Sequence, residues 1–87
     1  MQARYQLYAV PHPAGMAIYL RGGGGPPAYV MTHRKSRDLF RYLRPGRTLR
    51  EARAFRPGRN AAQQKMAKSL AHVVRVADWV IAEELAA

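Results

Sequence analysis

The sequence predicts an α+β domain: a three-stranded antiparallel sheet in the N-terminal half, one or two short helices, and a long C-terminal helix packed on the sheet. Three observations predict this order. Apolar residues alternate in short runs over residues 1–33, as they do in strands. Over residues 34–59 the apolar spacing becomes helical. No proline or glycine follows Gly58, so nothing interrupts a helix over residues 60–87. We expect residues 1–87 to form one small basic domain.

The first part of the chain predicts three strands. Residues 3–10 alternate well enough for a strand, and residues 16–21 predict the returning strand of a hairpin. Residues 11–15 contain two prolines and a glycine, which predict a turn between them. A Gly- and Pro-rich loop over residues 22–27 leads to a third strand over residues 28–33. No Gly-Lys-Ser/Thr follows the glycines, so this loop is expected to be a connector and not a phosphate-binding P-loop.

Two capping patterns predict short helices in the middle of the chain. Ser36 can cap a helix that Pro45 ends. Thr48 with Glu51 forms a capping-box pattern, followed by apolar residues at helical spacing up to Pro57. The residues after Thr48 would also fit a strand. We favour the helix, because the capping box is specific to helix starts.

The long helix begins at a good N-cap, Asn60, with Gln63 three residues on, where a capping box places Glu or Gln. A helix from Ala61 to about Leu85 measures about 37 Å at 1.5 Å per residue, so one end must project from the domain or meet another chain. Its core-facing stripe is expected to consist of Met66, Leu70, Val73, Ala77 and Val80.

Further apolar residues lie outside that stripe. Val74, Trp79 and Ile81 would make the helix apolar on most sides, which indicates burial on most sides. We expect these three residues to form a homodimer contact. The alternative is a wide core within one chain, in which Trp79 is a core anchor with Arg75 stacked on it.

The charge balance is the strongest functional signal. Fifteen Lys and Arg oppose five acids, which gives a formal net charge of +10 and a pI of about 11.2. A field of this strength on a small domain attracts polyanions. Nucleic acid is the leading candidate partner, and an acidic protein surface is the second.

Arginine occupies every third position from 41 to 59, and the phrase Arg-x-x-Arg-Pro-Gly-Arg occurs twice, at 41–47 and 53–59. Each Arg-Pro-Gly-Arg predicts a β-turn with Pro second and Gly third. Arg side chains match phosphate oxygens, and Tyr29 or Tyr42 could stack on bases. The candidate nucleic-acid- or anion-binding residues are Arg34, Lys35, Arg37, Arg41, Arg44, Arg47, Arg50, Arg53, Arg56, Arg59, Asn60, Lys65 and Lys68.

Other interpretations of the arginines remain open at this point. Charge runs are usually solvated faces, and this one would equally suit an acidic protein partner. Residues 36–55 also have the length of a helix-turn-helix, but no recognition helix is evident. Within the basic segment, Arg56, Arg59 and Asn60 predict an anion-binding corner at the start of the long helix, where no acid lies in the first turn.

Signals for catalysis are poor. Cysteine is absent, the three histidines have no metal-ligand spacing, and no nucleophile or paired-carboxylate motif occurs. We expect no enzyme activity, no metal, no cofactor and no membrane association, and a cytoplasmic location. The predicted function is nucleic-acid binding through phosphates with little base specificity. The alternative is a phage- or plasmid-type accessory or inhibitor protein that binds an acidic surface of a host protein or nucleoprotein complex.

Overall fold

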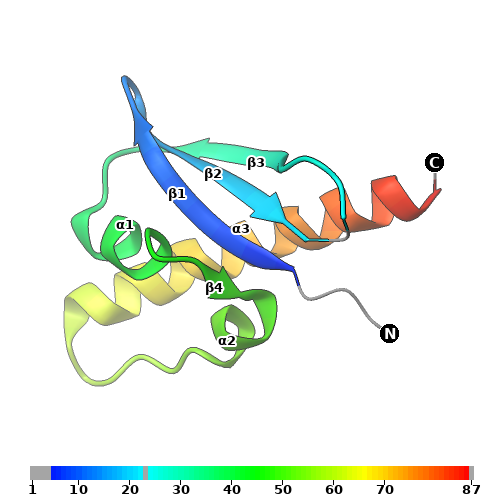
Figure 1. Cartoon of the computed structure of the whole chain (residues 1–87). Helices are drawn as coiled ribbons and strands as arrows, with labels where there is room; N and C mark the ends of the chain where they lie inside the picture. The colour runs from blue at the N-terminus through cyan, green and yellow to red at the C-terminus, as the bar shows by residue number, and fades with distance from the viewer. Residues whose placement is uncertain (1–4, 23, 87) are drawn as a thin grey trace.

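The computed structural model describes residues 5–22 and 24–86 and confirms an α+β fold (Figure 1). Its antiparallel sheet has the strand order β3-β2-β1-β4 within the described residues, so it has four strands where the sequence analysis expected three. In chain order the elements are β1 (Gln6–His12), β2 (Gly15–Arg21), β3 (Ala28–His33), α1 (Arg37–Leu43), β4 (Arg47–Thr48), α2 (Leu49–Ala54) and α3 (Ala61–Ala86).

The β1–β2 hairpin is longer than expected. The turn predicted over residues 11–15 is present but narrower: it spans residues 13–14, because Pro11 pairs with Met16 and His12 with Gly15 inside the ladder. Proline is tolerated there because β4 pairs with β1 only at Gln6 and Leu7, which leaves β1 as an edge strand at Pro11. Gly15 is required by its position: its φ is +138°, and an added Cβ would lie 2.3 Å from the His33 carbonyl oxygen.

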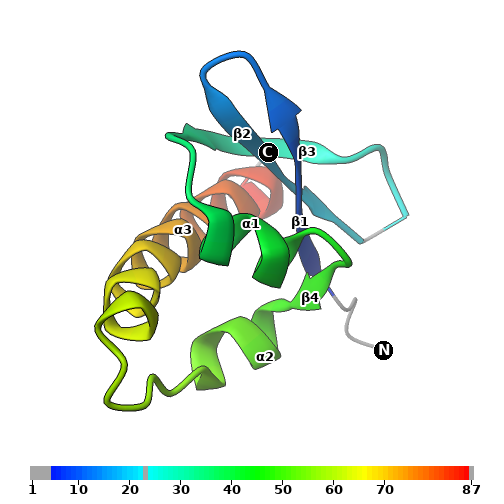
Figure 2. The ribbon, with the colours of Figure 1, turned by 90° about the vertical axis from the view of Figure 1, so that its left-hand side faces the viewer.

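The helices cover one side of the sheet (Figures 1 and 2). Alternate strand residues, such as Leu7, Ile18 and Leu20, point into the core on that side. Four residues of the predicted α3 stripe, Met66, Leu70, Val73 and Ala77, are buried in this core, whereas Val80 is half-buried and lies outside it. The last turns of α3 extend beyond the strands, as its length predicted (Figure 1).

The predicted helix starts are confirmed. The Ser36 side chain accepts a hydrogen bond from the Leu39 N–H at the start of α1. At α2, the Thr48 hydroxyl accepts from the Glu51 N–H at 3.0 Å, and the Glu51 carboxylate accepts from the Thr48 N–H at 3.1 Å. At α3, Asn60 Oδ1 accepts from two N–H groups of the first turn. The segment after Thr48 is therefore a helix, as favoured, and not a strand.

The two Arg-Pro-Gly-Arg phrases do not form the predicted turns. The first turn is displaced by one residue, since the Gly46 N–H donates to the Leu43 carbonyl and Arg44 continues the last turn of α1. Around the second phrase, no backbone hydrogen bond joins the Arg59 N–H to the Arg56 carbonyl among the described residues, and the Gly58 N–H donates to Gln63 Oε1 at 2.9 Å. In both places the neighbouring helix determines the hydrogen bonds of the phrase.

Candidate functional site

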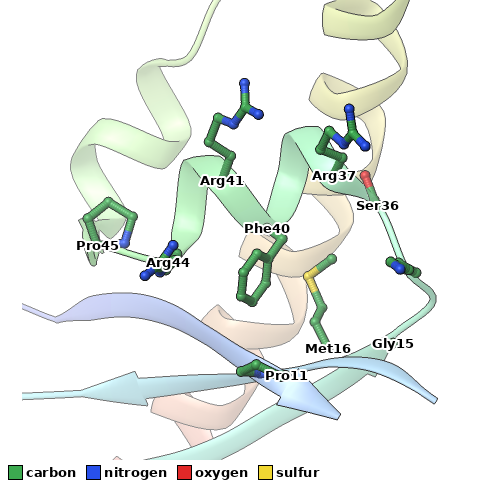
Figure 3. A pocket seen from close by; sticks show the side chains of 10 residues that line it. Pro11, Gly15, Met16, Ser36, Arg37, Phe40, Arg41, Arg44 and Pro45 are labelled. Carbon is green, nitrogen blue, oxygen red and sulfur yellow. The ribbon is translucent and has the colours of Figure 1, made fainter. Parts of the chain in front are cut away.

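A hollow of about 760 Å³ lies between α1 and the tip of the β1–β2 hairpin. Its apolar surface comes from three elements. Phe40 points from α1 toward Pro11 and Met16 of the hairpin, and Pro45 lies beyond the end of the helix (Figure 3). Met16 is fully buried beneath the surface, whereas Phe40 is half-buried and accessible from the hollow. The hollow therefore offers an aromatic ring on an apolar floor.

Four cations line the same hollow: Lys35, Arg37, Arg41 and Arg44. The three arginines recur at helical spacing along one side of α1, which begins at the Ser36 cap. Arg37 and Arg41 extend from the helix on the side opposite Phe40, away from the strands (Figure 3). All four side chains are exposed and make no hydrogen bond or ion pair with another described residue. Their charge is therefore available to a partner.

A second hollow, of about 310 Å³, joins this region to the first turns of α3. Arg34 and Lys65 line it, and the segment from Lys35 to Arg37 lines both hollows, so the two are adjacent. Asp38 is the one acid among its lining residues. The fold thus brings Lys65 beside cations that lie some thirty positions earlier in the chain. We call the combined surface the α1 basic surface; it consists of Arg34, Lys35, Arg37, Arg41, Arg44 and Lys65.

Arg47, one of the predicted phosphate ligands, is engaged within the chain instead. Its Nε donates to the Tyr42 carbonyl at 2.8 Å, and its guanidinium lies over the Tyr42 ring, 4.5 Å from the centroid. It also forms an ion pair with Glu51 at 3.8 Å. The hydrogen bonds from Thr48 lower the pKa of the Glu51 carboxyl, and Arg47 adds to this effect. Arg47 therefore holds α1, β4 and α2 together.

Arg53 is also engaged, because it makes a bidentate ion pair with Asp78 of α3. This pair raises the pKa of Arg53 and lowers the pKa of Asp78, with hydrogen bonding as the largest cause in both cases. Arg56 donates to the carbonyls of Arg53 and Phe55 after the end of α2. The Arg53–Asp78 pair ties α2 to α3, and the contacts of both arginines reduce the number that are free for a ligand.

The remaining predicted basic residues are scattered. Arg50, Arg59 and Lys68 are exposed, and they line neither hollow of the α1 basic surface. Asn60 uses its side-chain oxygen to cap α3, so two N–H groups of the predicted anion-binding corner are already satisfied. The anion-binding corner stays a prediction.

The two predicted stacking tyrosines have different surroundings. Tyr42 packs edge-to-face on Phe55, with centroids 5.3 Å apart, and lies under Arg47. Desolvation raises the pKa of the Tyr42 hydroxyl. Tyr42 is thus covered by the chain itself. Tyr29 is 54% exposed and lies on the open face of the sheet, away from the helices.

The three predicted dimer residues differ in how far they are buried. Val74 is only 6% exposed, because α2 packs on α3 and residues such as Ala52 and Phe55 lie around it. The alternative of a wide core within one chain is therefore correct for Val74. Ile81 is half-buried against the core, whereas Trp79 is 64% exposed and is not the core anchor of that alternative. A homodimer contact stays a prediction that depends on Trp79.

Sequence reasoning missed the apolar floor of the hollow. It placed Pro11 in a turn and gave Phe40 no role beyond the short helix that Ser36 caps. A signal was present: Phe40 lies on α1 between Arg37 and Arg44, and neighbouring helix positions project to different sides. The approach of the hairpin tip to that helix could not be inferred, because it depends on a non-local contact between β1 and α1.

Over the described residues, no helix is long and apolar enough to cross a membrane. No group of three or more potential metal ligands occurs in residues 5–22 and 24–86. In comparisons with known proteins, the chain matches no family model, no curated protein and no solved structure.

Proposed function

We propose that this protein binds nucleic acid through the α1 basic surface, contacting the phosphate backbone with little base specificity. The observation that carries the proposal is the hollow beside α1, which has an accessible phenylalanine on its apolar floor. Four cations without a partner among the described residues line it, and two of them, Arg37 and Arg41, extend away from that floor. Guanidinium groups match phosphate oxygens, and an aromatic ring accepts any base by stacking. The combination suits a polymer that alternates anionic and flat aromatic groups.

The distribution of acids supports the same proposal. All five acids of the chain lie after residue 37, and four of them lie outside the α1 basic surface. Glu51 pairs with Arg47, and Asp78 pairs with Arg53. These two acids therefore neutralise arginines that stabilise the fold, and not those of the α1 basic surface. The α1 basic surface itself carries six cations and one acid, Asp38, and this local excess of positive charge would attract a polyanion. The proposal includes a cytoplasmic location and no catalytic activity.

Titration of labelled DNA duplex, single-stranded DNA and RNA by fluorescence anisotropy tests the proposal. We expect binding at about 50 mM salt, because several phosphates are neutralised at once. The Arg41→Ala/Arg44→Ala variant should bind about tenfold more weakly, since it removes two charge-assisted contacts. Both side chains are exposed, so the fold should be unchanged.

The matched control is Arg50→Ala/Arg75→Ala. It removes the same charge from exposed helix positions that line neither hollow of the α1 basic surface. If the control weakens binding as much as the α1 variant, the contact surface lies elsewhere. If the wild-type protein binds none of the three nucleic acids, an acidic protein surface becomes the better candidate partner.

A further inference from the structure

The open face of the sheet, opposite the helices, carries a row of aromatic side chains that the basic segment does not explain. Tyr8 and Tyr19 are directly opposite in the hairpin ladder and stack with centroids 5.7 Å apart. Tyr19 meets Tyr29 of β3 edge-to-face at 5.9 Å. The guanidinium of Arg21 lies over the Tyr8 ring, 4.8 Å from its centroid. We call this set (Arg21, Tyr8, Tyr19 and Tyr29) the tyrosine row.

We propose that the tyrosine row binds single-stranded nucleic acid, with a base stacked on Tyr29 and a backbone phosphate at Arg21. The inference rests on the proposed function and adds its substrate class. A base in a duplex is paired and stacked, whereas a base in a single strand is free to stack on an aromatic side chain.

Tyr29 is suited to this role by exposure and by rigidity. It is 54% exposed, and its hydroxyl shares a 2.6 Å hydrogen bond with the Thr32 hydroxyl on the same face. The edge contact with Tyr19 holds the ring from the other direction. A ring fixed in advance loses little conformational entropy when a base stacks on it.

Charge identifies an anionic partner rather than an apolar one. Residues 5–33, which supply β1, β2 and β3, contain no acid, and Arg21 stands at one end of the row. Its Nε donates to Gln6 Oε1 at 3.1 Å, but, unlike Arg47, it forms no ion pair with an acid among the described residues, so its charge remains available to a phosphate. The same guanidinium lies beside Gly46, where an added Cβ would be 3.0 Å from Arg21 Nη2.

This last contact connects the tyrosine row to the α1 basic surface. Gly46 lies in the connection between α1 and β4, two residues after Arg44. Arg21 therefore lies beside the α1–β4 connection, and a strand that leaves Tyr29 and passes Tyr8 and Arg21 meets no acid of β1, β2 or β3 on the way. One polymer could contact both surfaces.

Binding of an oligothymidylate and of an abasic strand of equal length tests the inference, because the two carry the same phosphates and differ in their bases. We expect the wild-type protein to prefer the oligothymidylate about five- to hundredfold, the range for stacking of one base. Tyr29→Thr should reduce that preference at least fivefold and leave the affinity for the abasic strand unchanged. Tyr29→Phe, which keeps the ring, should retain the preference.

A second measurement needs no substitution: the ring protons of Tyr29 should shift in the NMR spectrum when oligothymidylate is added and stay in place with the abasic strand. Equal affinity for the two strands, or a preference that survives Tyr29→Thr, overturns the inference while the proposed function stands. Failure of the inference and failure of the proposed function give different results, because a protein that binds neither the oligothymidylate nor the abasic strand contradicts the proposed function itself.

Discussion

The ion pair between Arg53 and Asp78 allows a sharp test of which arginines serve the fold. It joins α2 to α3, and the two side chains are 52% and 42% exposed. Exposed ion pairs contribute about 0.2–1 kcal/mol, and the bidentate geometry places this pair near the upper value. We therefore expect a coupling free energy of about 1 kcal/mol, equivalent to a shift of about 4–8 °C in the midpoint of thermal unfolding.

A double-mutant cycle measures this coupling. Urea unfolding of the wild-type protein, Arg53→Ala, Asp78→Ala and the double variant gives four free energies of unfolding, and the cycle isolates the pair from other effects of each substitution. We expect each single variant to have a lower free energy of unfolding than the wild-type protein. The double variant should be only slightly less stable than either single variant. Arg53→Ala should leave affinity for nucleic acid nearly unchanged.

The coupling should also depend on pH with a defined sign. The pKa of Asp78 is lowered in the folded state, chiefly by its hydrogen bonds to Arg53. A carboxyl with a lowered pKa stabilises the fold above its unfolded pKa of about 3.9, and this stabilisation is lost as the pH falls through its folded pKa. The coupling should thus be complete at neutral pH and decrease below about pH 4. A coupling within experimental error of zero at neutral pH, or one that grows on acidification, would refute this account.

Two further predictions concern the fold and the assembly. Thr48→Ala removes the cap of α2 and should cost about 1 kcal/mol in the free energy of unfolding, whereas Thr48→Ser, which keeps a hydroxyl at the N-cap, should cost less. Thermal unfolding of both variants checks this, and equal losses would mean that the cap contributes nothing. Sedimentation at micromolar concentration should show a homodimer of the 9.8 kDa chain that Trp79→Ala converts to a folded monomer, because Trp79 is 64% exposed. A wild-type monomer, or a variant that unfolds, would contradict that prediction.

Local signals in the sequence predicted the elements that depend on local hydrogen bonds. Ser36, Thr48 and Asn60 each accept hydrogen bonds from residues two or three positions later, so their roles could be inferred from neighbouring residues. The alternation of apolar residues in the strands and the absence of Pro or Gly after Gly58 also predicted their elements from local sequence. By contrast, β4 is a two-residue strand within the arginine repeat, and its partners Gln6 and Leu7 lie some forty positions away.

The sequence predicted the positive charge of the candidate site but not which residues form it. The arginines at every third position from 41 to 59 suggested seven equivalent ligands. The structure instead assigns Arg47 and Arg53 to intramolecular pairs, with Asp78 lying 25 positions from Arg53. The tyrosine row could have been found: a hairpin with its turn at residues 13–14 places Tyr8 opposite Tyr19. The burial of Val74 could not have been predicted from the sequence, because it depends on how α2 packs against α3.

The salt dependence of binding tests the central claim most directly. For duplex DNA, the slope of log K against log salt is about −0.9 for each phosphate neutralised. The α1 basic surface should neutralise about five phosphates and give a slope of about −4 to −5. Arg41→Ala/Arg44→Ala should make the slope less steep by about 2, one for each lost phosphate contact. A slope near zero in the wild-type protein, or one that these two substitutions leave unchanged, would contradict phosphate binding by this surface.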